Sequence, residues 1–129
     1  MRKATCPFCS LSAERIVLSS DQAFVIRDAF PVSPGHTLVI PRRHVGSFFE
    51  LTDPERACIL VLLERAKSHL DSAFAPDGFN IDINEGVAAG QTVPHVHMHL
   101  IPRNLGDVSD PRGGVRWVLP VTAKYSTES

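Results

Sequence analysis

Three histidines alternate with apolar residues in the run PHVHMHLIP at positions 94–102, and they are His95, His97 and His99. Successive side chains of a β-strand point to opposite faces, so a strand here would place the three imidazoles on one face. On a helix the same side chains would fan out around the axis, and no row of imidazoles would form. Pro94 and Pro102 fit the ends of such a strand, because proline is not tolerated inside a hydrogen-bonded ladder. The run therefore predicts a strand that presents three imidazoles to one ligand.

This row of histidines is compatible with two kinds of site. The pKa of an unperturbed imidazole lies near neutrality, so histidine serves as a nucleophile, a general acid or base, or a metal ligand. Alternating histidines on a strand also suit Zn²⁺. The spacing alone leaves a catalytic site and a metal site equally open.

The loop directly before the histidines, NEGVAAGQTV at positions 84–93, carries two glycines and the hydrogen-bonding side chains of Asn84, Gln91 and Thr92. Glycine permits positive φ and close backbone approach, so successive N–H groups can converge on an anion. A glycine-containing loop by itself is more often a plain turn. Its position directly before three imidazoles favours a phosphate cradle.

The run NEGVAAGQTVPHVHMHLIPR resembles the histidine triad (HIT) proteins, whose signature is His-x-His-x-His followed by apolar residues. The segment PVSPGHTLVIPRRH is similar to the other shared segment of that family, and with CPFC near the start the resemblance covers about residues 6–103. The segment GQTVPHVHMHLIPR looks closer to the fragile-histidine-triad and bacterial branches than to the phosphoramidase branch. Transferase branches carry glutamine in place of the third histidine, so the resemblance implies hydrolysis rather than phosphorolysis or nucleotidyl exchange.

The resemblance implies a role for each histidine. His97, the middle one, would be the nucleophile, while His99 would contact the phosphate bridge and help to protonate the leaving group. His95 belongs to the same catalytic triad. His36, in the segment PGHTLV, matches a fourth active-site histidine, although a structural histidine would fit the same pattern. No metal is required at the reacting phosphorus in this scheme.

Other positions match substrate-binding residues of the family. Asp28 matches a residue that bonds the ribose, and it also fits an Asx turn that opens the following loop. Phe8 and Ile26 match positions of the base pocket, although apolar residues are more often simply core. The residues expected to orient phosphate oxygens are Asn84, Gln91 and Thr92.

Cys6 and Cys9 form a Cys-x-x-Cys pair, which by itself is half a zinc site, a redox motif or chance. A tetrahedral structural zinc needs two more ligands. The resemblance supplies them, because HIT proteins with this pair hold zinc with the two cysteines, a histidine corresponding to His44 and the first triad histidine, His95. Two buried free thiols are the alternative.

The resemblance implies an α+β fold with an antiparallel sheet of about five strands, one long helix and one short helix. We expect a single domain over residues 1–121 and a polar C-terminal tail at 122–129. Residue patterns agree, because short β-branched and aromatic runs at 15–19 and 22–27 predict a hairpin. A buried strand at 36–40 and an alternating strand at 79–83 complete this prediction.

The run Thr52-Asp53-Pro54-Glu55 predicts the start of a helix, with a capping residue, proline in the first turn and acids near the positive end. We expect this helix to end near Phe74. The apolar residues at helical spacing that predict its packed side are Ala57, Leu60, Val61, Leu63, Ala66 and Leu70.

The sequence also carries arginines at positions 42 and 43 and, shortly before Trp117, at positions 112 and 116. Arg42 and Arg43 are expected to be solvated surface charges. Trp117, with its neighbours Arg112 and Arg116, fits either an active-site contact or a dimer contact, and the residues leave both open.

Composition limits the classes of protein that fit. The 129 residues carry a net charge of −1, with no basic cluster for nucleic acid or a membrane surface. No apolar run is long enough to span a bilayer and no signal pattern opens the chain, so a cytoplasmic location is expected. Three cysteines in that reducing compartment do not predict a disulfide framework.

We therefore expect a nucleotide hydrolase that cleaves dinucleoside polyphosphates, such as diadenosine tri- or tetraphosphate, at the α-phosphate. The reaction would pass through a nucleotidyl-histidine intermediate and release a nucleoside monophosphate. A nucleoside phosphoramidate hydrolase and a non-catalytic nucleotide-binding protein are the alternatives. By analogy with the family, the chain is expected to form a homodimer.

Overall fold

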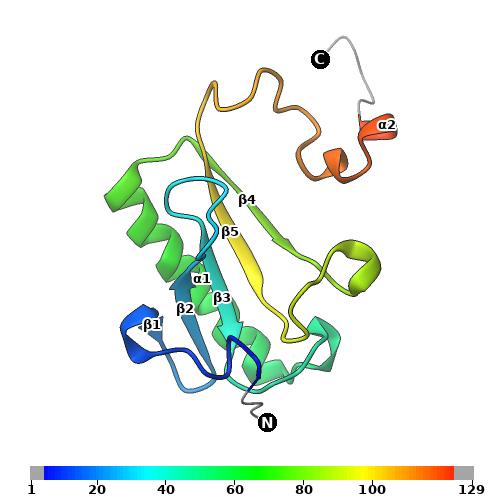
Figure 1. Cartoon of the computed structure of the whole chain (residues 1–129). Coiled ribbons are helices and arrows are strands. Elements are labelled where there is room, and N and C mark those ends of the chain that lie inside the picture. The colour runs from blue at the N-terminus through cyan, green and yellow to red at the C-terminus, as the bar shows by residue number, and fades with distance from the viewer. Residues whose placement is uncertain (1–4, 124–129) are drawn as a thin grey trace.

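One antiparallel sheet organises the chain, with five strands in the order β1-β2-β3-β5-β4, in a computed structural model that describes residues 5–123 (Figure 1). The strands are β1 (Ile16–Ser19), β2 (Ala23–Arg27), β3 (Thr37–Pro41), β4 (Gly78–Ile83) and β5 (Met98–Arg103). The helices are α1 (Asp53–Phe74) and α2 (Pro120–Ala123), with short 3₁₀ segments η1 (Ala13–Arg15), η2 (Phe48–Glu50), η3 (Val87–Ala89) and η4 (Gly114–Val118). The predicted α+β fold, with one long and one short helix, is confirmed.

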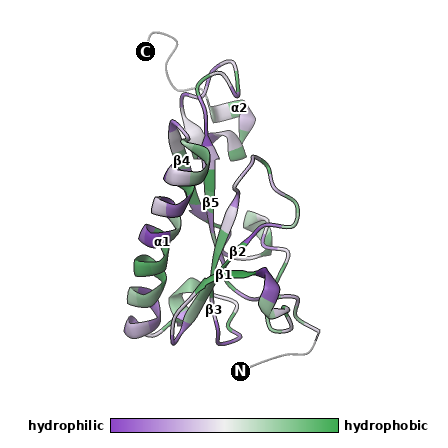
Figure 2. Ribbon diagram, turned by 90° about the vertical axis from the view of Figure 1, so that its left-hand side faces the viewer, coloured by the Kyte–Doolittle hydropathy of each residue, from purple (hydrophilic) through white to green (hydrophobic). Residues whose placement is uncertain are grey.

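The long helix α1 begins where the sequence predicts, because Thr52 and Glu55 form a capping box. The Thr52 side chain accepts a hydrogen bond from the Glu55 amide, and the Glu55 carboxylate accepts one from the Thr52 amide. The helix ends at Phe74 where Ala75 adopts a left-handed conformation, with φ of 46°. Figure 2 shows α1 along one side of the sheet.

The predicted packed side of α1 is partly wrong. Leu60 and Val61 are each 57% exposed, while Ile59 and Leu62 are buried. The middle of the helix is apolar around most of its circumference, so composition does not select the packed side there. The buried stripe follows the sheet, and its residues are Glu55, Ile59, Leu62, Ala66 and Leu70.

The two faces of the sheet carry separate apolar clusters. Val25, Val39 and Leu100 belong to the larger cluster, which packs against α1. The opposite face of β2 and β3 carries a smaller cluster, which is covered by residues near the N-terminus. Its buried members are Phe24, Ile26, Leu38 and Ile40.

The strand that carries the histidines is shorter than predicted. β5 begins at Met98, so His95 and His97 lie in the segment that leads into it. Pro102 lies inside β5 rather than at its end. It is tolerated because β3 pairs with β5 only as far as Leu100, so within residues 5–123 β4 is the only strand beside Pro102. The alternation itself persists.

The prediction that Arg43 is a solvated charge is wrong. Its guanidinium donates to both carboxylate oxygens of Glu55, at 2.8 and 3.0 Å, and thereby ties the chain after β3 to the start of α1. Arg42 donates from Nε to the Ser20 carbonyl oxygen at 2.9 Å and lies over the ring of Phe24.

The C-terminal part of the described chain includes α2, which ends at the buried Ala123. The predicted boundary between domain and tail, at residues 121 and 122, falls inside this helix. Residues 124–129 of the predicted tail lie outside the described residues. Across positions 5–123, no helix combines the length and the apolar character that a membrane span requires.

Candidate active site

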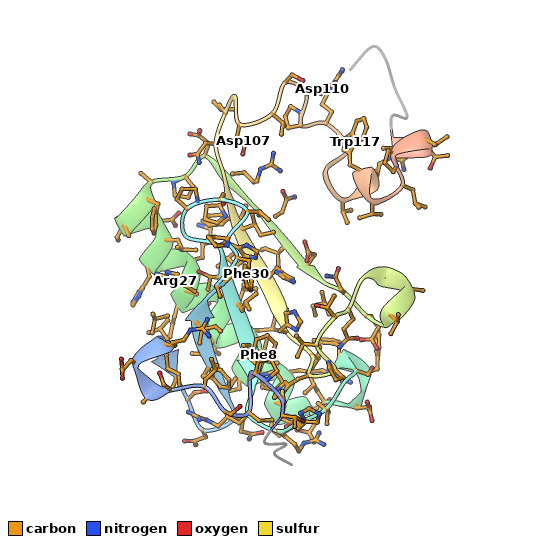
Figure 3. The ribbon with its side chains drawn as sticks, in the orientation of Figure 1. Phe8, Arg27, Phe30, Asp107, Asp110 and Trp117 are labelled. Carbon is orange, nitrogen blue, oxygen red and sulfur yellow. The ribbon has the colours of Figure 1, made fainter. Side chains whose placement is uncertain are left out.

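A cavity of about 440 Å³ lies over the sheet face that is opposite α1. Its walls come from the N-terminal segment, β2, the loop after β2, the loop before the histidines, and the histidine segment itself. Figure 3 shows Phe8 and Phe30 at this side of the molecule. The predicted site residues that line it are Phe8, Ile26, Asp28, His36, Asn84, Thr92, His97 and His99. Of the predicted site residues outside the metal cluster, only Gln91 is missing from this lining.

His97 has its ring fixed by the backbone two residues earlier. Its Nδ1 lies 2.9 Å from the carbonyl oxygen of His95, and a carbonyl only accepts, so Nδ1 carries the proton. In the neutral ring, Nε2 is then the nitrogen with a lone pair. Burial lowers the pKa of His97 and so favours this neutral form.

His99 and His36 form a second pair of rings beside His97. Nε2 of His36 lies 2.9 Å from Nδ1 of His99 and 3.4 Å from Oδ2 of Asp28. The ring centroids of His97 and His99 are 5.1 Å apart. Burial lowers the pKa of both His36 and His99, and the charges of Asp28 and Asp82 partly oppose this effect.

His95 is fully buried and turns away from the cavity, so two of the three imidazoles, His97 and His99, face one site rather than all three as predicted. Its Nε2 donates to the carbonyl oxygen of Pro41 at 2.7 Å, which leaves the lone pair on Nδ1. That nitrogen faces the cysteine pair, at 3.4 Å from Sγ of Cys6 and 3.6 Å from Sγ of Cys9. Nδ1 of His44 lies 3.3 Å from Sγ of Cys9.

These four residues have the donor set and spacing of a structural zinc site. The ligand atoms of Cys6, Cys9, His44 and His95 all lie within 4.8 Å of one another. Two ligands on a tetrahedral zinc, one sulfur and one nitrogen, are separated by about 3.5 Å for ordinary bond lengths, which agrees with the spacings here. Burial raises the pKa of the Cys6 thiol, and a bound cation would counter this effect by stabilising the thiolate. The predicted set therefore fits zinc.

The side chain of Gln91 holds the loop before the histidines in place. The Gln91 side chain accepts from the Gly86 amide at 2.8 Å and donates to the carbonyl oxygens of Gly46 and Val93, at 2.8 and 3.1 Å. Gly86 and Gly90 have φ of 92° and 95°, as the loop prediction required. With its amide committed to the backbone, Gln91 shapes the loop that carries Thr92 to the cavity.

Sequence analysis missed three residues of the site. Asp82 lies opposite His99 in the β4–β5 register, and its charge acts on three of the histidines. An acidic residue within an alternating apolar strand was the available signal. Arg15 and Phe30 also line the cavity, and only the folding of distant segments brings them there.

Trp117 and Arg116 hold the C-terminal segment together by hydrogen bonds to its backbone. Trp117 donates from Nε1 to the Arg112 carbonyl oxygen at 2.9 Å, and Arg116 donates to the carbonyl oxygens of Thr122 and Ala123. Figure 3 shows Trp117 far from Phe8, which lines the cavity. Within one chain, these residues do not reach the cavity.

Known proteins are similar to this chain in both sequence and fold. A family model described as "HIT domain" matches residues 11–106. A nitrilase and fragile histidine triad fusion protein of Caenorhabditis elegans is 37% identical over 101 residues, which cover 78% of this chain and 23% of that protein. Its crystal structure superposes with a TM-score of 0.73 at 36% identity, over 78% of this chain and 24% of that one.

Two further relatives bear on chemistry. An asymmetrical bis(5′-nucleosyl)-tetraphosphatase of Schizosaccharomyces pombe is 42% identical over 80 residues, which cover 62% of this chain and 44% of that protein. A Zn-bound histidine triad family protein of Mycobacterium smegmatis superposes with a TM-score of 0.71 at 35% identity, over 80% of this chain and 78% of that one. The chain thus spans less than half the length of the nematode and yeast relatives. Since the family model matches most of its residues, the chain belongs to the HIT family.

Proposed function

We propose that the chain is a nucleotide hydrolase that cleaves dinucleoside polyphosphates at the α-phosphate through a nucleotidyl-His97 intermediate. The observation that carries this proposal is the ring of His97 at the cavity wall, with its proton on Nδ1 and its lone pair on Nε2. The similarity to a bis(5′-nucleosyl)-tetraphosphatase supports the substrate class.

The reaction has two steps. Nε2 of His97 attacks the α-phosphorus, a new P–N bond forms, and the bond from phosphorus to the bridging oxygen breaks. The remaining nucleotide departs as an anion, and His99 lies beside His97 to interact with the departing oxygen. Water then attacks the same phosphorus and releases a proton to solvent, the P–N bond breaks, and a nucleoside monophosphate and neutral His97 are formed.

The other cavity residues bind and orient the substrate. Phe8 and Ile26 form the apolar wall for one base, and Asn84 and Thr92 orient phosphate oxygens. Oδ1 of Asp28 accepts a hydrogen bond from the Phe30 amide at 2.8 Å, as in an Asx turn. The second carboxylate oxygen, Oδ2, would accept a hydrogen bond from a ribose hydroxyl. Both sequence interpretations of Asp28 are therefore compatible in one geometry.

Replacing His97 by alanine tests the covalent step. We expect wild-type protein to convert diadenosine tri- and tetraphosphate to AMP. Protein quenched in alkaline denaturant, in which a P–N bond persists, should carry an adenylyl group by mass spectrometry. The H97A variant should lose both, and full turnover by H97A would exclude the mechanism. Incorporation of isotopically labelled inorganic phosphate into ADP would indicate phosphorolysis instead of hydrolysis.

Two alternative functions give different outcomes in the same assays. Faster turnover of adenosine phosphoramidate than of diadenosine polyphosphates would favour the phosphoramidate hydrolase. Tight binding of AMP by calorimetry, with no turnover of any of these substrates, would favour the non-catalytic nucleotide-binding protein.

We also propose that Cys6, Cys9, His44 and His95 hold a structural zinc. The bound ion would tie the N-terminal segment to the chain after β3 and to the start of the histidine segment. It would supply no chemistry at phosphorus, because His95 points its Nδ1 away from the cavity. Elemental analysis of the purified protein is the direct test, and a folded, active chain without metal would refute the proposal.

A homodimer is the proposed assembly. β4 is an edge strand of the sheet, and Ile81 on it is 51% exposed. Pairing with a second copy would satisfy backbone groups that have no strand neighbour within residues 5–123. Sedimentation equilibrium should give twice the chain mass for wild type and a monomer for I81K, and a wild-type monomer would contradict the proposal.

A further inference from the structure

A chain of hydrogen bonds runs from the loop after β2 to the ring of His99. The backbone amide of Val32 lies 3.1 Å from Nδ1 of His36. A backbone amide can only donate, so Nδ1 of His36 accepts and carries no proton. The proton of the neutral His36 ring is therefore on Nε2.

The state of His36 determines the state of His99. Nε2–H of His36 has two groups in front of it, Nδ1 of His99 at 2.9 Å and Oδ2 of Asp28 at 3.4 Å. An ionised carboxylate only accepts, which agrees with a donor at Nε2 of His36. Nδ1 of His99 must accept as well, so the proton of neutral His99 is on Nε2.

We propose that His36 is a positioning residue that holds His99 in the Nε2–H tautomer, so that His99 offers a hydrogen-bond donor to the departing oxygen. This inference rests on the function proposed above. No proton leaves the His99 ring in this step, because the neutral imidazole stabilises the anion by donating a hydrogen bond.

The two neighbouring rings thereby receive opposite tautomers from opposite backbone groups. A backbone carbonyl, that of His95, accepts from Nδ1 of His97 and leaves Nε2 as a nucleophile. A backbone amide, that of Val32, acts through His36 and leaves Nε2–H of His99 as a donor. Burial lowers the pKa of His36 and of His99 and so favours the neutral form of both rings, which the hydrogen-bond geometry requires.

The same residues raise a competing interpretation, because Asp28, His36 and His99 place one ligand atom each within 4.8 Å. Two histidines and a carboxylate are a common metal-binding set. A metal on Nε2 of His36 would need a bare nitrogen there and a proton on Nδ1. That proton would point at the amide hydrogen of Val32, whose nitrogen lies only 3.1 Å from Nδ1, so the observed hydrogen bond favours proton sharing over metal binding.

The first test measures tautomers and needs no substrate. In protein with ¹⁵N-labelled histidine, long-range correlation spectra distinguish protonated from bare ring nitrogens. We expect His99 to be bare at Nδ1 and protonated at Nε2 in wild type and in H36Q, whose amide keeps a donor near the position of Nε2. In H36L, a second tautomer with the proton on Nδ1 of His99 should appear.

The matched control is H69L, which changes a histidine on the exposed side of α1 and should leave the spectrum of His99 unchanged. Circular dichroism establishes that each variant is folded. A proton on Nδ1 of His99 in wild type would overturn the proposal, and so would an unchanged tautomer in a folded H36L. A shift of the His36 and His99 ring nitrogens on adding Zn²⁺ beyond one equivalent would establish metal binding instead.

The second test measures what the tautomer does. A series of adenosine 5′-aryl phosphates, whose phenols differ in acidity, varies the need for a donor at the departing oxygen. In H36L we expect kcat/KM to fall about tenfold for the most basic phenol and little for the most acidic one, with H36Q restoring most of the loss. An equal fall across the series would indicate a merely structural effect and refute the positioning role.

Failure of this inference is distinguishable from failure of the proposed function. An inactive wild type with the expected tautomers would reject the hydrolase while leaving the His36–His99 geometry intact. An active wild type with the opposite tautomer at His99 would reject the positioning role alone.

Discussion

Replacing Glu55 by glutamine tests how the start of α1 is held to the chain that carries His44. The Glu55 side chain is 6% exposed and accepts three hydrogen bonds, two from Arg43 and one from the Thr52 amide. Glutamine has the same size and can still accept from Thr52. The substitution therefore removes the charge of the pair while it preserves the cap.

The expected magnitude follows from the pKa of Glu55, which is lowered from 4.5 to about 2, mainly because Arg43 donates hydrogen bonds to the carboxylate. One pKa unit corresponds to about 1.4 kcal/mol, so the Glu55–Arg43 pair, if it were shielded from water, would contribute about 3 kcal/mol to the free energy of unfolding. The Arg43 side chain is 40% exposed and water screens the pair. We therefore expect E55Q to lower the free energy of unfolding by about 2 kcal/mol at pH 7.

The dependence on pH has a definite sign. The folded pKa of Glu55 lies below its unfolded value, so its contribution is fully present above pH 4.5 and is lost as the pH falls through about 2. Urea unfolding of wild type and E55Q should show a difference of about 2 kcal/mol at pH 7 that stays constant down to about pH 4.5 and shrinks from there toward pH 2.

The control is D53N, because Asp53 is 96% exposed in its ion pair with Arg56. Its charge acts mainly on the helix dipole, so D53N should lower the free energy of unfolding by less than about 1 kcal/mol. No loss of stability in E55Q at pH 7 would refute the reasoning. A loss that stays constant from pH 7 to pH 2 would also refute it, since it could not arise from the charge of Glu55.

Three further predictions address the loop, the metal and the mouth of the cavity. Gly35 has φ of 90°, and a Cβ there would lie 3.0 Å from the side chain of Leu70. We therefore expect G35A to lower the free energy of unfolding in urea by about 2 kcal/mol. The control G106A should cost clearly less, because Gly106 has φ of 85° but a Cβ there would meet no atom within 4 Å. C9S should abolish the zinc found by elemental analysis and lower the melting temperature, whereas retention of zinc by C9S would contradict the proposed ligand set. Phe30 lines the cavity and is 87% exposed, so a base of the substrate can stack on its ring. Loss of that stack in F30A should raise KM for diadenosine tetraphosphate about fivefold without changing stability. An unchanged KM would exclude stacking on this ring.

Local patterns in the sequence were enough to predict the alternation in the histidine run, the start of α1 and the fold family. The period of two in the histidine run correctly separated the side chains that face the core from the imidazoles. Thr52 and Glu55 correctly located the start of α1, because a capping box involves only neighbouring residues. The family and the five-stranded fold followed from the motifs that carry the resemblance.

Other features depend on contacts between segments that are distant in the sequence, and only the tertiary structure decided them. Which apolar residues of α1 are buried was set by the sheet, which selected Leu62 and left Leu60 in solvent. The ring of His95 faces the cysteines because Pro41, more than fifty positions away, accepts its Nε2 proton. Asp82 lies opposite His99 through the register of β4 and β5. A residue type and its spacing limit which partners a side chain can have, but the approach of distant backbone selects the partner and, with it, the nitrogen that carries the proton.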